Sequence, residues 1–119
     1  MSKFNLRQLQ VGEHIKRVLA GLFLSGDFGE DLSKNVSISE VKIASGLKHA
    51  SIFISCLSEE ETKKKVKLLN ENKKHVRFVL AKHLESRFVP NIVFEADLTG
   101  FYASKINDIL NSDDVKKDL

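Results

Sequence analysis

The side chains of this sequence that could do chemistry are lysines and arginines gathered in one segment. Residues 63–87 hold nine basic and two acidic residues, although the 119-residue chain has a formal net charge of only +3. Cations this dense are typical of a surface that binds a polyanion, because each one can neutralise a phosphate. The alternative is a solvated helix face without a partner. The predicted residues for binding such a polyanion, for example RNA, are Lys63, Lys64, Lys65, Lys67, Lys73, Lys74, Arg77, Lys82 and Arg87.

Residues for catalysis or metal binding do not form a recognisable pattern. The sequence has no P-loop, no dinucleotide fingerprint and no G-x-S-x-G elbow. Its four histidines have no metal-ligand spacing, and His83 is expected to pack in the core. Cys56 is expected to be a small buried apolar residue within a strand. We therefore expect no catalytic residue, no metal and no cofactor.

The tetrapeptide Gly-Asp-Phe-Gly at residues 26–29 has two functional alternatives. It matches the GxxG loop of KH domains and contains the DFG of protein kinases. The other kinase motifs are missing, and the neighbouring carboxylates would repel the phosphates that a GxxG loop clamps. We expect only a turn here, within a loop over residues 26–35.

Hydrophobic spacing predicts the elements that position the basic segment. Apolar residues recur at the helical period over residues 9–24, and again in two stretches between 58 and 84. Ser58 and Glu61 form a capping box that starts the second helix, and the phase break at residues 70–74 predicts a kink before the third. Pro90 is expected to stop the third helix, and a last helix is expected over residues 103–110.

Three strands complete the pattern, at residues 36–43, 50–57 and 91–98, with a bulge near Ser39 and Glu40. The first two are joined by a short connection and form an antiparallel hairpin. The order α-β-β-α-α-β-α is that of a type II KH domain. The predicted fold class is α+β, KH-like, with a three-stranded sheet and the helices on one face.

Phe78 is expected on the outward side of the third helix, among the cations. An outward aromatic ring could stack on a base. It could equally pack under the first helix or the C-terminal tail, and we favour packing.

The composition favours a soluble, cytoplasmic protein that works as a monomer. A single cysteine excludes an internal disulfide, and no apolar run approaches the ~18 residues that a membrane span needs.

The sequence also resembles the ribosome-binding factor A family of bacterial small-subunit assembly factors. The most specific element is R-F-V-P-N-I-V-F at residues 87–94 followed by Asp97, which is similar to the family's R-x-V-P-x-L-x-F-x-x-D. Support comes from the hairpin, residues 41–43 and 47–54, and from the helix ending at residues 76–84. The resemblance covers roughly residues 4–112, which we expect to form the RNA-binding domain, followed by a polar tail at 113–119.

The resemblance implies a KH-like fold in which a helix-kink-helix replaces the GxxG loop. The family usually carries Ala-x-Gly at the kink, and the matching positions here are Asn72, Lys73 and Lys74. It further implies a non-catalytic factor that binds the immature 30S subunit and its 16S rRNA. Such factors assist late maturation of that RNA, including its 5′ end, and matter most in the cold. The competing expectations are a general KH-like RNA chaperone and a small RNA-processing enzyme.

Overall fold

The computed structural model describes residues 6–84 and 89–105. Arg87, the end of the last predicted helix and the predicted tail at 113–119 lie outside these residues. The elements in chain order are α1 (Leu6–Ser25), α2 (Glu30–Ser33), β1 (Ser37–Ile43), the 3-10 turn η1 (Ser45–Leu47), β2 (His49–Ser55), α3 (Glu59–Glu71), α4 (Lys73–His83) and β3 (Asn91–Ala96). Residues 99–105 are also helical.

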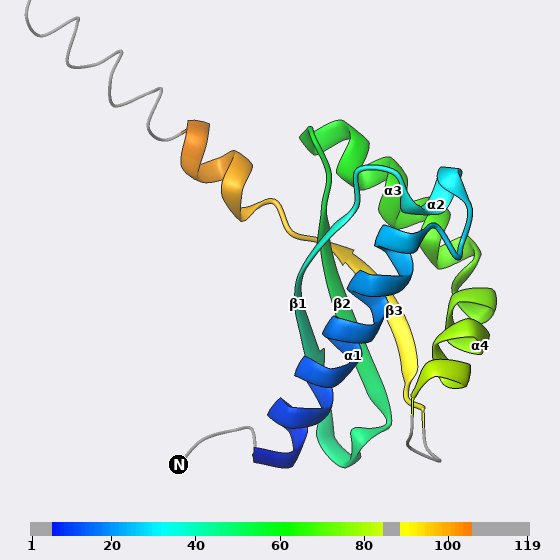
Figure 1. The fold of residues 1–119 in the computed structure, drawn as a ribbon. Helices are drawn as coiled ribbons and strands as arrows, with labels where there is room; N and C mark the ends of the chain where they lie inside the picture. The colour runs from blue at the N-terminus through cyan, green and yellow to red at the C-terminus, as the bar shows by residue number, and fades with distance from the viewer. Residues whose placement is uncertain (1–5, 85–88, 106–119) are drawn as a thin grey trace, which may run out of the picture.

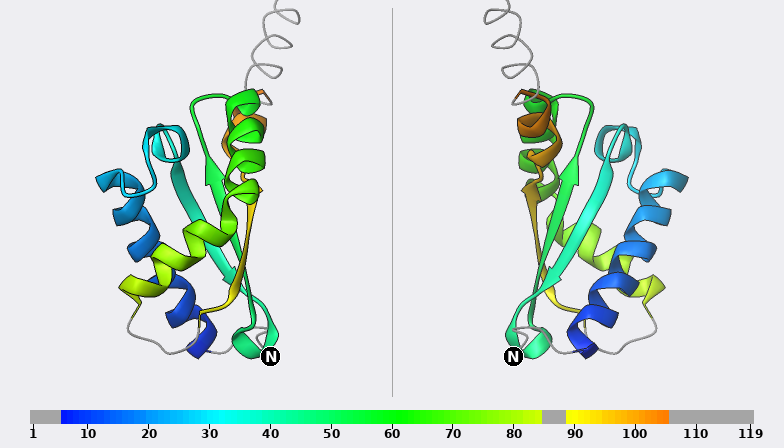
Figure 2. Two further views of the ribbon diagram at one scale, coloured as in Figure 1. Left: turned by 90° about the vertical axis from the view of Figure 1, so that its right-hand side faces the viewer. Right: turned by 90° about the vertical axis from the view of Figure 1, so that its left-hand side faces the viewer.

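The three strands form one sheet in the order β1-β2-β3. β1 and β2 are antiparallel, whereas β2 and β3 run parallel. The α3–α4 helix pair provides the crossover that a parallel pair needs. α1, α3 and α4 lie against the same face of the sheet (Figures 1 and 2). The predicted α+β architecture and the antiparallel hairpin are confirmed.

The predicted bulge is present in β1. The pairing register with β2 shifts between Ile38 and Glu40. The hydroxyl of Ser39, the extra residue, donates a hydrogen bond to the Phe53 carbonyl at 3.2 Å. This bond holds the bulged strand to its neighbour at the point where the ladder is interrupted.

The core lies between the sheet and the three long helices. The largest fully buried apolar side chains come from every long helix and from β2 and β3: Ile15, Leu19, Ile52, Ile54, Leu69, Val76, Leu80 and Phe94. α1 lies very close to β1, since a Cβ on Gly12 would be 2.8 Å from the Val41 carbonyl oxygen. Any side chain at Gly12 would push the helix off the strand.

The outer edge of β3 is bonded to side chains of the helix pair rather than to a fourth strand. The Asn70 side-chain amide accepts a hydrogen bond from the Phe94 N–H at 2.8 Å and donates one to the Phe94 carbonyl at 2.9 Å. The Arg77 guanidinium donates to the carbonyls of Val89 and Pro90, at 2.6 and 3.1 Å. These bonds cover an edge that would otherwise be open to another chain.

The loop predicted over residues 26–35 was wrong in part, because it contains the short helix α2. Leu32 within α2 and Phe28, two residues before this helix, are both buried, and the Phe28 ring lies 5.1 Å from the Phe23 ring. This packing fixes a turn that propensity alone does not predict. The turn at residues 26–29 is confirmed, because Gly26 and Gly29 both have positive φ.

The predicted end of the third helix was also wrong. α4 ends at His83, and Leu84 is extended, well before Pro90. The chain must turn back from α4 to the start of β3, and a helix continued to Pro90 would carry it away from the sheet. His83, expected in the core, lies exposed in this last turn.

We expect Asn70→Ala to lower the free energy of unfolding by about 2–3 kcal/mol. The change leaves the N–H and the carbonyl of Phe94 without partners at a largely buried position. Urea denaturation followed by circular dichroism measures the loss. Asn91→Ala is the matched control, because Asn91 is an exposed asparagine on the same strand and should cost less than about 0.5 kcal/mol. Equal losses in the two variants would contradict the role of Asn70.

Candidate nucleic-acid interface

The helix pair that carries the basic residues begins at a well-formed cap. The Ser58 hydroxyl accepts a hydrogen bond from the Glu61 N–H at 3.1 Å, which confirms the predicted start of this helix with Ser58 as its N-cap. Behind it, the buried Thr62 hydroxyl donates to the Ser58 carbonyl at 2.7 Å and accepts from the Cys56 N–H at 2.9 Å. The connection from β2 into α3 is thus fixed by side-chain hydrogen bonds at both ends.

The cations in the first half of α3 are balanced by carboxylates of the same helix. Lys63 lies 3.4 Å from Glu59, and Lys64 lies 3.1 Å from Glu60. Lys105 also contacts Glu59, at 3.0 Å, and this hydrogen bond is the main reason that the pKa of the Glu59 carboxyl is lowered. Over residues 59–65, three carboxylates and three ammonium groups cancel. This half of the helix presents little net field to a polyanion.

From the end of α3 onward, the cations are not balanced. Residues 67–82 hold five cations and one carboxylate, Glu71. Four of these cations, Lys67, Lys73, Lys74 and Lys82, are exposed, and none forms an ion pair with a carboxylate of the described residues. We call these four lysines the α4 cation face.

Arg77, the fifth cation, has a structural partner. Its guanidinium donates to the two carbonyls at the start of β3 that were described above. Because those bonds hold α4 to the sheet, Arg77 is less free than its neighbours to contact a phosphate.

The kink between α3 and α4 lies at Asn72, as predicted. Its backbone has φ −110° and ψ 15°, and its side chain donates to the Leu68 carbonyl at 2.8 Å. The next two residues, Lys73 and Lys74, form the exposed start of α4. The kink therefore sets the direction in which these two ammonium groups project.

Phe78 lies in the middle of α4 and is 60% exposed. The Lys82 ammonium sits over its ring, 4.4 Å from the ring centroid. The sequence analysis favoured a packing role for Phe78. Among the residues that the structure describes, that interpretation is wrong, because no element covers the ring. Two lysines of the α4 cation face, Lys74 and Lys82, thus lie four residues before and after an exposed aromatic ring.

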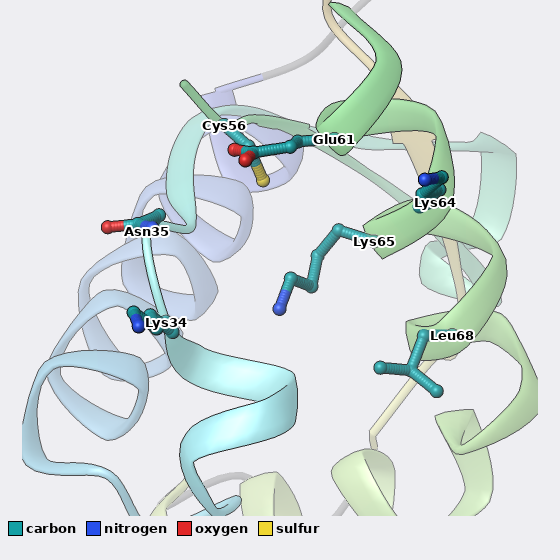
Figure 3. A pocket seen from close by; sticks show the side chains of 7 residues that line it. All are labelled: Lys34, Asn35, Cys56, Glu61, Lys64, Lys65 and Leu68. Atoms are coloured by element: carbon teal, nitrogen blue, oxygen red, sulfur yellow. The ribbon is translucent and has the colours of Figure 1, made fainter. Parts of the chain in front are cut away.

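A second group of lysines lines a hollow of about 330 Å³ between α2 and α3. Figure 3 shows Lys65 reaching from α3 into this hollow, with Cys56 and Glu61 together at one end. Lys34, from the segment after α2, lies on its opposite side. The sequence did not indicate Lys34, because it is about 30 residues from the basic segment and only the fold brings it close.

The lysines of this hollow already have oxygen partners. Lys65 donates a hydrogen bond to the Asp31 carbonyl, and Lys34 and Lys64 lie within 4 Å of carboxylates on their own helical turns. Glu61 also lines the hollow, so together with Glu30 and Glu60, which pair with Lys34 and Lys64, three carboxylates offset its three lysines. The candidate interface is therefore the α4 cation face and not this hollow.

The described residues hold no cluster of three histidine, cysteine, aspartate or glutamate side chains that could bind a metal ion. None of the helices in residues 6–84 and 89–105 is long and apolar enough to span a membrane.

Cys56 does not lie within a strand, which corrects its predicted position. It follows the end of β2, is half-buried and lines the hollow. Burial raises the pKa of its thiol and outweighs the opposite effect of the nearby Lys65 ammonium.

We expect iodoacetamide to label Cys56 of the native protein at pH 7 more slowly than Cys56 of the urea-unfolded chain. The raised pKa lowers the fraction of thiolate, which is the form that reacts. Mass spectrometry of quenched samples gives both rates. A native rate equal to or above the unfolded rate would show a reactive thiol.

The sequence is similar to that of a known protein family over most of its length. The sequence model of the family "Ribosome-binding factor A" matches residues 7–110. Ribosome-binding factor A of Zymomonas mobilis is 32% identical over 117 residues, which are 97% of this chain and 83% of that protein.

Solved structures agree on the fold. A Thermotoga maritima protein is 26% identical with a TM-score of 0.63, covering 79% of this chain and 91% of its own. A homology model of Thermus thermophilus ribosome-binding factor A, fitted into the cryo-EM map of a 30S complex, is 17% identical with a TM-score of 0.59, covering 73% of this chain and 91% of its own. These likenesses support the predicted KH-like fold. Because the family model matches residues 7–110 and the Zymomonas mobilis relative is 32% identical over 97% of this chain, the chain belongs to the ribosome-binding factor A family.

Proposed function

We propose that this protein is a non-catalytic assembly factor that binds the small ribosomal subunit through its 16S rRNA. Membership of the family supports this function, as does the 30S complex of the Thermus thermophilus relative. A factor of this kind acts where ribosomes assemble, so the proposal includes a cytoplasmic location. We further propose that the protein binds as a monomer, through the domain at residues 4–112.

The observation that carries the proposal is the exposed α4 cation face. Its four lysines lie on one helix pair, from one turn before the kink to the end of α4, without carboxylate partners among the described residues. RNA offers one phosphate per nucleotide, and unpaired lysines can contact phosphates without first breaking an ion pair. Of the predicted RNA-binding residues, we assign the main phosphate contacts to these four.

The other predicted residues have weaker support in the same proposal. Lys63, Lys64 and Lys65 would have to leave oxygen partners, and Arg77 would have to release β3. Arg87 lies outside the described residues and remains a proposed contact.

Purified small subunits test the interface. If four lysines neutralise phosphates, the slope of log K against log salt should be about −2.8 to −3.6, so binding should weaken about 50- to 150-fold between ~50 and ~200 mM salt. Lys73→Gln combined with Lys74→Gln should make that slope shallower by about 1.4–1.8 and weaken binding at low salt. The melting temperature should stay nearly unchanged, because both side chains are exposed. Co-sedimentation over a salt series measures the affinities.

The matched control is Lys63→Gln combined with Lys64→Gln. It removes the same charge from the same helix pair, at positions already paired with carboxylates. We expect this control to change the slope of log K against log salt by less than half as much as the double substitution of Lys73 and Lys74 does. A larger effect of the control pair, or binding that ignores salt, would mean that the α4 cation face is not the RNA-facing surface. Equal affinity for unrelated structured RNA would instead favour a general RNA chaperone.

Assistance in late 16S maturation, including the RNA 5′ end, belongs to the same proposal, as does a greater need for the factor in the cold. Depletion of the protein in its host should raise the fraction of 16S rRNA with an unprocessed 5′ end, and more so at low temperature. Primer extension on RNA from free small subunits measures that fraction. Normal 5′ ends after depletion at both temperatures would contradict this part of the proposal.

A further inference from the structure

We propose that Phe78 is a stacking platform for an unpaired nucleobase, so that the α4 cation face binds single-stranded RNA in preference to a duplex. This inference rests on the proposed function and specifies the form of RNA that the surface recognises.

Phe78 differs from the other phenylalanines of the described residues in its exposure. Phe23, Phe28 and Phe94 are buried, and the remaining two are partly covered, whereas Phe78 is 60% exposed. An exposed apolar residue alone needs no functional explanation. The neighbours of this ring are what point to a ligand.

Cations lie one helical turn on either side of the ring. Lys74 precedes Phe78 by four residues and Lys82 follows it by four, so all three share one face of α4. The two lysines are about 12 Å apart along the helix axis, at ~1.5 Å per residue. Lys82 lies over one face of the ring, 4.4 Å from its centroid, so a base that stacks on that face would displace the Lys82 ammonium toward the adjoining phosphate. An aromatic ring with a cation on either side matches a nucleotide, whose base stacks while the adjoining phosphates meet the charges.

The same arrangement argues against a duplex. In an A-form helix the faces of the bases are stacked on one another, and only the edges and the backbone are accessible. A ring such as Phe78 would gain little from such a surface, because stacking requires a base face. An unpaired loop, bulge or strand end provides one.

A protein partner fits this surface less well. Protein interfaces have a core of adjoining apolar residues from which charged residues, lysine above all, are depleted. On this face Phe78 is the one large apolar side chain, with lysines at both neighbouring turns. The arrangement therefore favours RNA.

Two variants of Phe78 separate stacking from charge. Phe78→Leu keeps an apolar side chain and removes the aromatic face, and Phe78→Tyr keeps the aromatic face. The probes are a single-stranded RNA oligonucleotide with one 2-aminopurine and a blunt RNA duplex of the same length, titrated by fluorescence anisotropy. We expect Phe78→Leu to weaken single-strand binding about fivefold or more, Phe78→Tyr to retain it, and neither to change duplex binding. Quenching of the 2-aminopurine should be lost in Phe78→Leu only.

The salt dependence distinguishes this inference from the proposed function. Since Phe78→Leu removes no charge, its slope of log K against log salt should equal that of the unchanged protein. Tyr102→Leu is the control, because Tyr102 is another exposed aromatic residue with a lysine, Lys105, 5.9 Å from its ring centroid but lies outside α4. It should leave single-strand binding unchanged.

Three results would overturn the inference. The first is that Phe78→Leu binds the single strand with the same affinity and the same salt slope as the unchanged protein does. This result would refute stacking and leave the proposed function standing. A loss confined to whole subunits, with naked RNA bound normally, would show that Phe78 contacts a protein. Binding by the unchanged protein that is absent or independent of salt would refute the proposed function and this inference with it.

Discussion

The pair of hydrogen bonds between the Asn70 side chain and the Phe94 backbone is the constraint on which the rest of the helix pair depends. A lone edge strand gives no fixed position to the helices beside it, because side-chain packing tolerates sliding and rotation. Asn70 bonds both backbone groups of one residue of β3, which fixes the end of α3 along the strand and in rotation. Arg77 connects α4 to the carbonyls of Val89 and Pro90, just before β3. With both helices held, the buried sides of α3 and α4 are determined, and so are the lysines that point outward.

The acidic first turn of α3 has an effect beyond starting the helix. Glu59, Glu60 and Glu61 interact favourably with the helix dipole, and Glu59 and Glu60 also pair with the lysines one turn later. The same pairing cancels the field of those lysines, so the part of the basic segment that stabilises α3 differs from the part that is free for a ligand. Counting the cations along a sequence therefore overestimates the number that are available to a ligand. The count is too high when carboxylates four residues earlier on the same helix pair with some of them.

Much of the fold could be predicted from the sequence because its determinants are local. The Ser58 cap, the bulge beside Glu40 and the kink at residues 70–74 each depend on a few neighbouring residues. The two errors in the fold depend on how the chain packs rather than on its local pattern. α2 forms because Phe28 packs on Phe23, and α4 ends early because the chain has to return to β3. In the candidate site, the lysine positions followed from the helical period, but the structural role of Arg77 depends on carbonyls twelve and thirteen residues away.

The kink departs from the Ala-x-Gly that the family resemblance implies at residues 72–74. Lys74, which stands in place of the glycine, lies inside α4 and is not among the residues with positive φ, so no glycine is needed there. The Asn72 side chain bonds back to α3 instead of capping α4. α4 therefore begins with no side-chain cap and no acidic residue in its first turn, and with two lysines next to the positive end of its dipole. That arrangement is unfavourable for the helix alone, since cations at a helix N-terminus are destabilising by a few tenths of a kcal/mol or more. The positive potential that destabilises the first turn of α4 is the potential that attracts a phosphate. Departures from a local stability rule are expected where a surface binds a ligand, and this one coincides with the start of the α4 cation face.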